Sequence, residues 1–185
     1  MIYKFLLLSD EVETFSREIC IDSEATFLEL NDAILESVNY TKDQLTSFFI
    51  CEDNWEKREE VTLIEMDSSS DEDVWLMEDT RLSELIEEEH QRALFVFDMM
   101  ADRSFFMELR EIELGKNLLD PLCTKAKGNA PKQVMSIEEM DKKFAASSTI
   151  DIDEDDYGIE NGYNPDELDT EGFSDMDFSE DNGGY

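Results

Sequence analysis

Acidic side chains greatly outnumber basic ones in this chain of 185 residues: 49 Asp and Glu stand against 15 Lys and Arg, a formal net charge of -34. A polyanion of this size repels nucleic acid and anionic lipid and is drawn to basic protein surfaces. Direct nucleic-acid binding is therefore not expected. The hydrophobic residues, 41% of the chain, suffice for one core of ordinary domain size.

Cysteine use and the amino terminus predict a cytoplasmic protein. The apolar stretch at the amino terminus is followed directly by acids, which favours a strand over a signal peptide, and no run approaches the roughly 18 apolar residues of a membrane span. Cys20, Cys51 and Cys123 are odd in number and far apart. This pattern favours reduced thiols over a disulfide frame or a zinc site. We expect no membrane association and no cofactor.

The first elements are a strand pair and a helix. Residues 2–8 and 14–21 are apolar or alternating runs separated by polar residues, which predicts two antiparallel strands. Thr26 and Glu29 then form a capping-box signature, and Phe27, Leu30 and Ile34 recur at helical spacing. A helix beginning at this box is expected to pack one face on a sheet. A short helical turn is expected near residues 41–46, leading into an aromatic strand.

The middle of the chain predicts further strands. The segment EEVTLIEMD is strand-like, and VWLM predicts a short strand before a helical turn. The runs ALFVFDM and SFFMELREIEL are rich in aromatic and branched residues, and the polar ADR between them predicts a hairpin. Phe105, Met107 and Leu109 alternate with polar or exposed positions, as in a sheet with one buried face.

The end of the chain differs in composition. Lysines lie among Pro and Gly in residues 116–132, and we interpret them as holding this loop against the chain's own carboxylates. Ser136 and Glu139 predict a third, short helix over residues 135–146. From Ser147 onward there are fourteen acids and no Lys or Arg. We expect residues 147–185 to form an acidic, disordered tail, because they lack the periodic apolar pattern of a core.

These features resemble the plasmid pRiA4b ORF-3-like family over residues 1–134. The resemblance is carried by three motifs and one reduced segment: Phe15, Ser16 and Arg17; Thr26, Phe27, Leu30 and Asn31; Phe97, Asp98, Met99, Met100, Ala101, Asp102 and Arg103; and Ala130, Pro131, Lys132 and Gln133. Family histidines are replaced, with Asn31 after the helix leucine, and the Gly and Trp of the hairpin are lost.

The resemblance implies an α+β fold in which an antiparallel sheet packs against helices. It also implies a bacterial protein of a family found on plasmids and beside mobile elements, with no established reaction. If the family has a polar active centre, this chain has lost most of it. Asp98 and Asp102 match family positions at the hairpin and are the candidates for a polar site, where they would bind a cation or cap the turn's own amides.

Other polar residues give little support for catalysis. His90 is the single histidine, and no motif places a Ser or Cys nucleophile beside it, so we interpret it as solvated. Cys51 is expected in a strand core, and Glu87, Glu88 and Glu89 on a solvated face. We therefore expect no catalytic residues and no metal ligands.

The tail segment DIDEDDYGIENGY matches a calcium-binding loop only in part. Asp151, Asp153 and Asp155 match the first three ligand positions of an EF-hand loop. The loop also needs Gly at its sixth position and Glu at its twelfth, where this chain has Asp156 and Gly162. Specific calcium binding is not expected.

Aromatic and apolar residues among the tail acids predict a binding role. Solvating tails need no such residues, whereas a binding segment uses charge for encounter and aromatic groups as anchors. The expected anchors are Tyr157, Ile159, Tyr163, Phe173, Phe178 and Tyr185.

Two functions remain open. In the first, the protein is a non-enzymatic interaction protein whose tail binds a basic surface of a nucleic-acid-handling partner, such as RNA polymerase or the ribosome, and mimics nucleic acid there. In the second, it is a degenerate or cryptic metal-dependent enzyme that uses Asp98 and Asp102, and the tail keeps it soluble.

Overall fold

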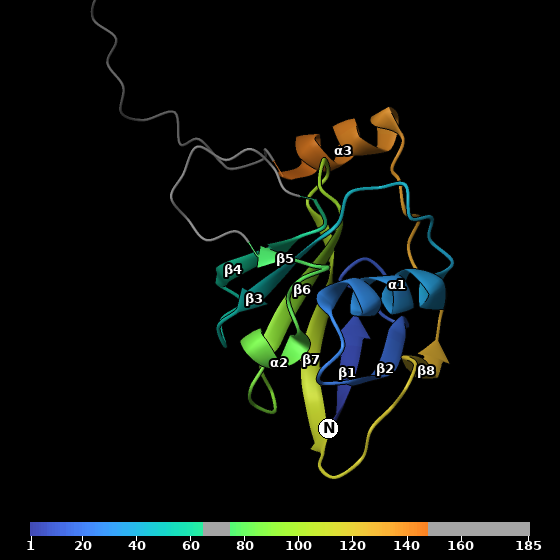
Figure 1. Cartoon of the computed structure of the whole chain (residues 1–185). Helices are drawn as coiled ribbons and strands as arrows, with labels where there is room; N and C mark the ends of the chain where they lie inside the picture. The colour runs from blue at the N-terminus through green and yellow to red at the C-terminus, as the bar shows by residue number, and fades with distance from the viewer. Residues whose placement is uncertain (65–74, 148–185) are drawn as a thin grey trace, which may run out of the picture. The chain divides into compact units, whose positions relative to one another are not determined.

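The computed structural model describes residues 1–64 and 75–147, without the side chains of residues 143–147. The chain divides into two units, Met1–Phe144 and Ala145–Tyr185, and the fold described below is that of the first. Along the chain (Figure 1) the elements are β1 (Ile2–Leu8), β2 (Ser16–Asp22), α1 (Phe27–Val38), β3 (Ser47–Cys51), β4 (Lys57–Thr62), β5 (Trp75–Leu76), α2 (Leu82–Leu85), β6 (Arg92–Asp98), β7 (Arg103–Glu113), β8 (Leu122–Lys127) and α3 (Ile137–Ser147).

The strands form one sheet in the order β5-β4-β3-β6-β7-β1-β2-β8. All neighbouring strands are antiparallel except β4 and β5, which pair in parallel over Val61–Trp75 and Thr62–Leu76. The expected α+β fold is thus confirmed, with a mixed rather than a purely antiparallel sheet. In the described part of the chain, no helix is long and apolar enough to cross a membrane.

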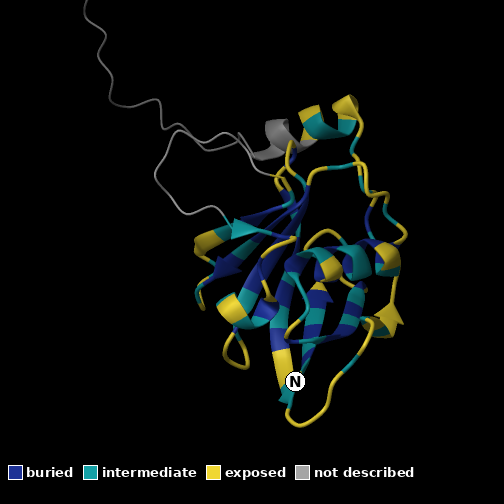
Figure 2. Cartoon of the chain, viewed as in Figure 1, coloured by how far each residue is buried: buried dark blue, intermediate teal, exposed yellow. Residues whose placement is uncertain are grey.

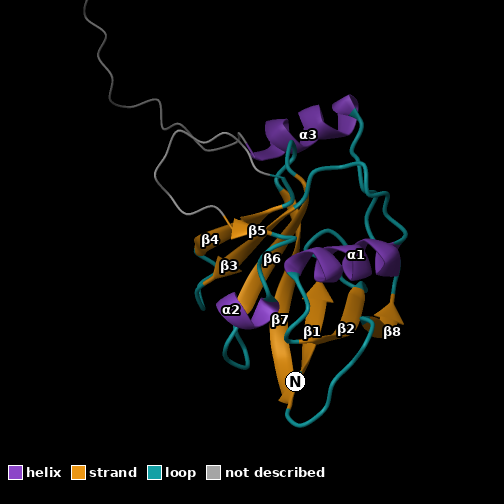
Figure 3. Ribbon diagram, in the orientation of Figure 1, coloured by secondary structure: helices purple, strands orange, loops and turns teal. Residues whose placement is uncertain are grey.

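One face of the sheet carries the core. α1 and α2 lie on the same side of the sheet (Figure 3), and the strand residues that point to that side are buried. Tyr3, Phe5 and Leu7 of β1 alternate with less buried neighbours, and Phe105, Met107 and Leu109 of β7 follow the same rule. Figure 2 shows this buried centre between α1 and the strands. The alternation expected for the β7 sequence is confirmed.

Local sequence explains where α1 begins and ends. Thr26 Oγ1 accepts from the Glu29 amide at 3.3 Å, and the Glu29 carboxylate accepts from the Thr26 amide at 2.8 Å, so the capping box is present. The helix ends at Asn39, whose φ of 56° is left-handed and is tolerated better by Asn than by most residues. Phe27, Leu30 and Ile34 form the buried stripe that packs on the sheet.

Some sequence-based expectations differ from the structure. The short helical turn expected near residues 41–46 is observed as a non-helical turn that leads into β3. The lysine-rich segment, interpreted as a loop, contains the strand β8, which pairs with β2. Its predicted ion pairs nevertheless form: Lys116 contacts Glu113, Lys125 contacts Glu18 and Lys132 contacts Glu139.

Candidate functional site

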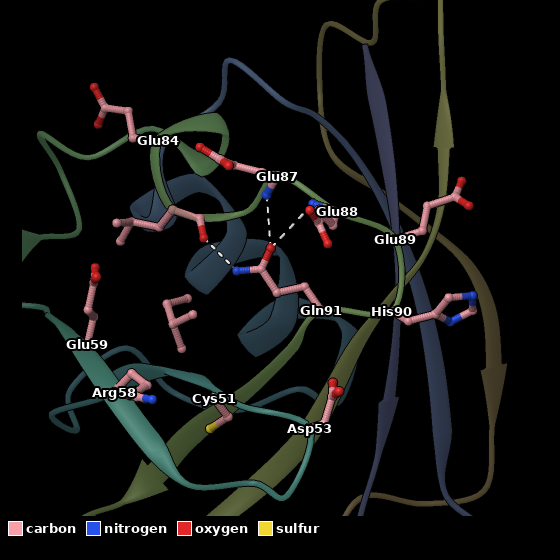
Figure 4. A pocket seen from close by; sticks show the side chains of 12 residues that line it. Cys51, Asp53, Arg58, Glu59, Glu84, Glu87, Glu88, Glu89, His90 and Gln91 are labelled. Carbon is pink, nitrogen blue, oxygen red and sulfur yellow. Dashed lines mark hydrogen bonds between the residues drawn. The ribbon is translucent and has the colours of Figure 1, made fainter.

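An open pocket of about 660 Å³ lies between the β3–β4 hairpin and the segment that joins α2 to β6. Ile50 of β3 and Leu85 of α2 supply apolar lining. Six of its polar lining residues are acidic: Asp53, Glu59, Glu84, Glu87, Glu88 and Glu89. The Glu89 carboxylate points away from the cavity (Figure 4) and accepts from the Ile112 amide at 2.8 Å. We call this cavity the acidic pocket, and Figure 4 shows its side chains.

Gln91 holds the acidic wall in place. Its side-chain Nε2 donates to the Leu85 carbonyl at 2.6 Å, and its Oε1 accepts from the Glu87 amide at 2.9 Å. A longer bond of 3.4 Å reaches the Glu88 amide (Figure 4). Because one side chain satisfies three backbone groups of the segment, the glutamates project from a fixed backbone rather than from a free loop.

The charge of the pocket is poorly compensated from within. Arg58 lines it and pairs with Glu52, which is not a lining residue. Like charges gathered on low-dielectric walls raise the local concentration of counter-ions. The pocket is therefore suited to a cationic group that has an aliphatic portion to place against Ile50 and Leu85, such as a Lys or Arg side chain.

His90 and Cys51 line the same pocket without forming a catalytic pair. His90 Nδ1 lies 2.9 Å from Glu108 Oε1, and this contact is the largest cause that lowers the pKa of the Glu108 carboxyl. The His90 side chain is 70% exposed, as expected for a solvated residue. Cys51 is buried at the end of β3, as predicted, and burial raises the pKa of its thiol, which disfavours a reactive thiolate.

The hairpin candidates Asp98 and Asp102 are engaged in separate local contacts. Asp98 accepts from the Ala101 amide at 3.2 Å, the expected turn-capping role, and its other oxygen lies 3.3 Å from Arg103 Nη1. Asp102 is 82% exposed and pairs with Lys57 at 3.4 Å. Within residues 1–64 and 75–147, no group of three or more His, Cys, Asp or Glu side chains is arranged to hold a metal ion.

Arg103 organises the hairpin end of the sheet. Its guanidinium forms two bonds with the Glu11 carboxylate, Nε to Oε1 at 2.6 Å and Nη2 to Oε2 at 2.8 Å. It also donates to the carbonyls of Lys132 and Gln133. We call Arg103 with these partners and Asp98 the Arg103 clasp.

The predicted tail anchors lie outside the described residues. These are Tyr157, Ile159, Tyr163, Phe173, Phe178 and Tyr185. Glu87, Glu88 and Glu89 are exposed, as expected for a solvated face, but the sequence did not predict that they line a pocket. The adjacent Gln91 was a signal for an ordered segment, because its amide can accept and donate hydrogen bonds at once. Its backbone partners, however, cannot be inferred from sequence spacing alone.

Comparisons with known proteins show which family the chain resembles. Residues 4–171 match the model of the family described as plasmid pRiA4b ORF-3-like protein, so the match extends past residue 134 into the acidic segment. A crystal structure from Methanosarcina mazei Go1, described as protein of unknown function MM3350, is similar with a TM-score of 0.57 and 18% identity. That similarity covers 78% of this chain and 79% of the other, and it supports the fold alone. No curated protein matches.

Proposed function

The chain belongs to the plasmid pRiA4b ORF-3-like family, and from that premise we propose that it is a non-enzymatic interaction protein that binds a basic surface. The observation that carries the proposal is the acidic pocket, whose lining includes six acidic residues and one arginine that is already paired with Glu52. The partner is a cytoplasmic protein that handles nucleic acid, such as RNA polymerase or the ribosome, because such proteins present basic surfaces to phosphate.

Long-range charge supports encounter with such a partner. The net charge of -34 exceeds what the pocket alone supplies, and attraction at this scale speeds association at low salt. The same charge lets the protein occupy a nucleic-acid site as a mimic. Single exposed ion pairs contribute only about 0.2–1 kcal/mol, so charge alone gives weak and salt-sensitive binding.

Tail aromatics supply the second part of the proposal. Tyr157, Tyr163 and Phe173, with Phe178 and Tyr185, are spaced among the tail acids. Aromatic side chains bury a large area per residue and are enriched in binding hot spots. In this proposal the acids bring the partner close and the aromatics slow its release.

The alternative of a degenerate metal-dependent enzyme has less support. It needs Asp98 and Asp102 to share a cation, whereas Asp98 contacts Arg103 and the turn amide, and Asp102 contacts Lys57. Both carboxylates already have partners that a metal would displace.

Affinity capture tests the proposal. The intact chain is immobilised, incubated with host lysate at low salt and eluted by a salt gradient, and bound proteins are identified by mass spectrometry. We expect a basic nucleic-acid-handling protein that is released at moderate salt and displaced by added RNA or DNA. A variant in which the five tail aromatics become Ser keeps the net charge and should retain less of it. Capture of no basic protein by the intact chain would contradict the proposal.

A further inference from the structure

β8 is a long edge strand of the sheet that the described residues form. It is the last strand in the order, and among the described residues β2 is the one strand that pairs with it. The opposite edge is β5, which has two residues against six in β8. Five of the six β8 residues are exposed. An exposed row of backbone donors and acceptors is the template on which an extended peptide adds as a further strand.

A groove runs beside this edge, between β8 and α1. It has a volume of about 440 Å³, and its lining includes Cys123 together with Glu29, Asp32, Glu36 and Asp120. In the sheet, residues directly opposite each other share a face. Cys123 lies opposite Ile19, and Ala126 lies opposite Arg17, whose Nε donates to the Ser37 carbonyl of α1. Cys123 and Ala126 therefore lie on the α1 side of the sheet, and Cys123 lines the groove.

The two faces of β8 differ in charge. Lys125 lies opposite Glu18 and Lys127 opposite Ser16, so both lysines face away from α1. On the groove side the carboxylates of α1 already accept an ammonium group: Lys42 Nζ lies 2.8 Å from Asp32 and 3.6 Å from Glu36. A strand added at β8 would meet the acids of α1 on one face, and on the other Lys127 and Lys125, which pairs with Glu18 at 2.7 Å.

We propose that β8 binds an extended segment of the basic partner as an added strand, with Lys or Arg at alternate positions directed into the groove. The residues between them, acidic or polar, lie beside Lys125 and Lys127. The inference rests on the proposed function and assigns a second contact surface to the same partner. A second copy of this chain fits poorly, because antiparallel pairing of two β8 edges would bring their lysines together.

Two octapeptides of equal composition test the alternation. One alternates Glu and Lys, and the other has four Glu followed by four Lys. Both are neutral, so attraction to the polyanion as a whole does not distinguish them, and like charges at i,i+4 disfavour a helix in the alternating peptide. We expect the alternating peptide to bind the intact chain at least about tenfold more tightly, because it alone can satisfy both faces of β8 at once.

Backbone pairing and location are tested separately. Methylation of alternate peptide amides removes the hydrogen-bond donors without altering charge, and it should weaken binding by about tenfold or more.

Cys123 is partly exposed in the groove whereas Cys20 and Cys51 are buried. The alternating peptide should therefore slow alkylation of Cys123. Asp32→Asn with Glu36→Gln should weaken binding, and the control Glu138→Gln with Asp141→Asn, which removes equal charge from α3, should not.

The outcomes separate this inference from the proposed function. Equal binding of both octapeptides, indifference to methylation, or unprotected Cys123 overturns the added strand, while capture of a basic partner would leave the proposed function standing. Failure of the alternating peptide to bind also overturns the inference. If the alternating peptide binds at β8 but no basic partner is captured, the result would instead contradict the proposed function.

Discussion

The Arg103 clasp makes a strong prediction about stability. The Arg103 side chain is 2% exposed, and Glu11 provides two of its shortest contacts, at 2.6 and 2.8 Å. Glu11→Gln keeps the shape but replaces the carboxylate by an amide that cannot balance the guanidinium charge. Removing one partner of a buried ion pair costs about 3–5 kcal/mol. The Glu11 side chain is 28% exposed and Asp98 remains, so we expect the lower figure of about 2–3 kcal/mol.

Urea unfolding followed by circular dichroism measures this loss. With m-values of about 1–3 kcal/mol/M for small proteins, the midpoint should fall by roughly 0.7–3 M at unchanged m. The matched control is Glu24→Gln, because Glu24 pairs with Arg81 at 2.9 Å while both side chains are more than half exposed. That change should cost less than about 1 kcal/mol. Equal effects of the two substitutions would refute the structural role assigned to Arg103.

Three further predictions concern the folded part. Gly128→Ala should destabilise the protein more than Gly115→Ala. Both glycines have φ near +70°, but at Gly128 the new Cβ would also lie 2.6 Å from the Thr14 carbonyl oxygen. Urea unfolding curves of the two variants test this difference. Contacts with Lys116 first, then Lys4, hold the pKa of Glu113 at about 2, below its ordinary 4.5. The ionised Glu113 carboxylate therefore contributes fully to folding stability above about pH 5, and this contribution is lost as pH falls toward 2. The melting-temperature difference between wild type and Glu113→Gln should shrink over that range. A constant difference would count against the contact. Finally, added salt should raise the melting temperature of this polyanion at neutral pH by screening self-repulsion, and a fall would contradict that.

Much of the fold could be predicted because local signals and tertiary packing agree. α1 has a capping box at Thr26 and a regular apolar stripe, and the same residues form the observed cap and buried face. The β6–β7 hairpin was likewise evident from two apolar runs around a polar turn. In these segments the apolar residues recur in the sequence at the same spacing as the buried positions in the structure.

β8 and the acidic pocket could not be predicted for a different reason. β8 is exposed over most of its length, so pairing with β2 rather than burial defines it as a strand, and no alternation marks it in sequence. The pocket depends on Glu59 of β4 lying across from Glu87, and nothing local specifies that approach. The partner of Arg103 is equally remote, since Glu11 lies 92 residues earlier.

Binding of a basic peptide to two charge-matched variants tests the central claim most directly. Glu87→Gln with Glu88→Gln removes two charges from the acidic pocket, and Glu138→Gln with Asp141→Asn removes two exposed charges from α3. Titration of each intact chain with an octalysine peptide at constant ionic strength gives the comparison. The account predicts at least about fivefold weaker binding for the pocket variant and less than about twofold for the control. Equal weakening of both variants would show that net charge alone attracts the peptide and would contradict a pocket built for a basic partner.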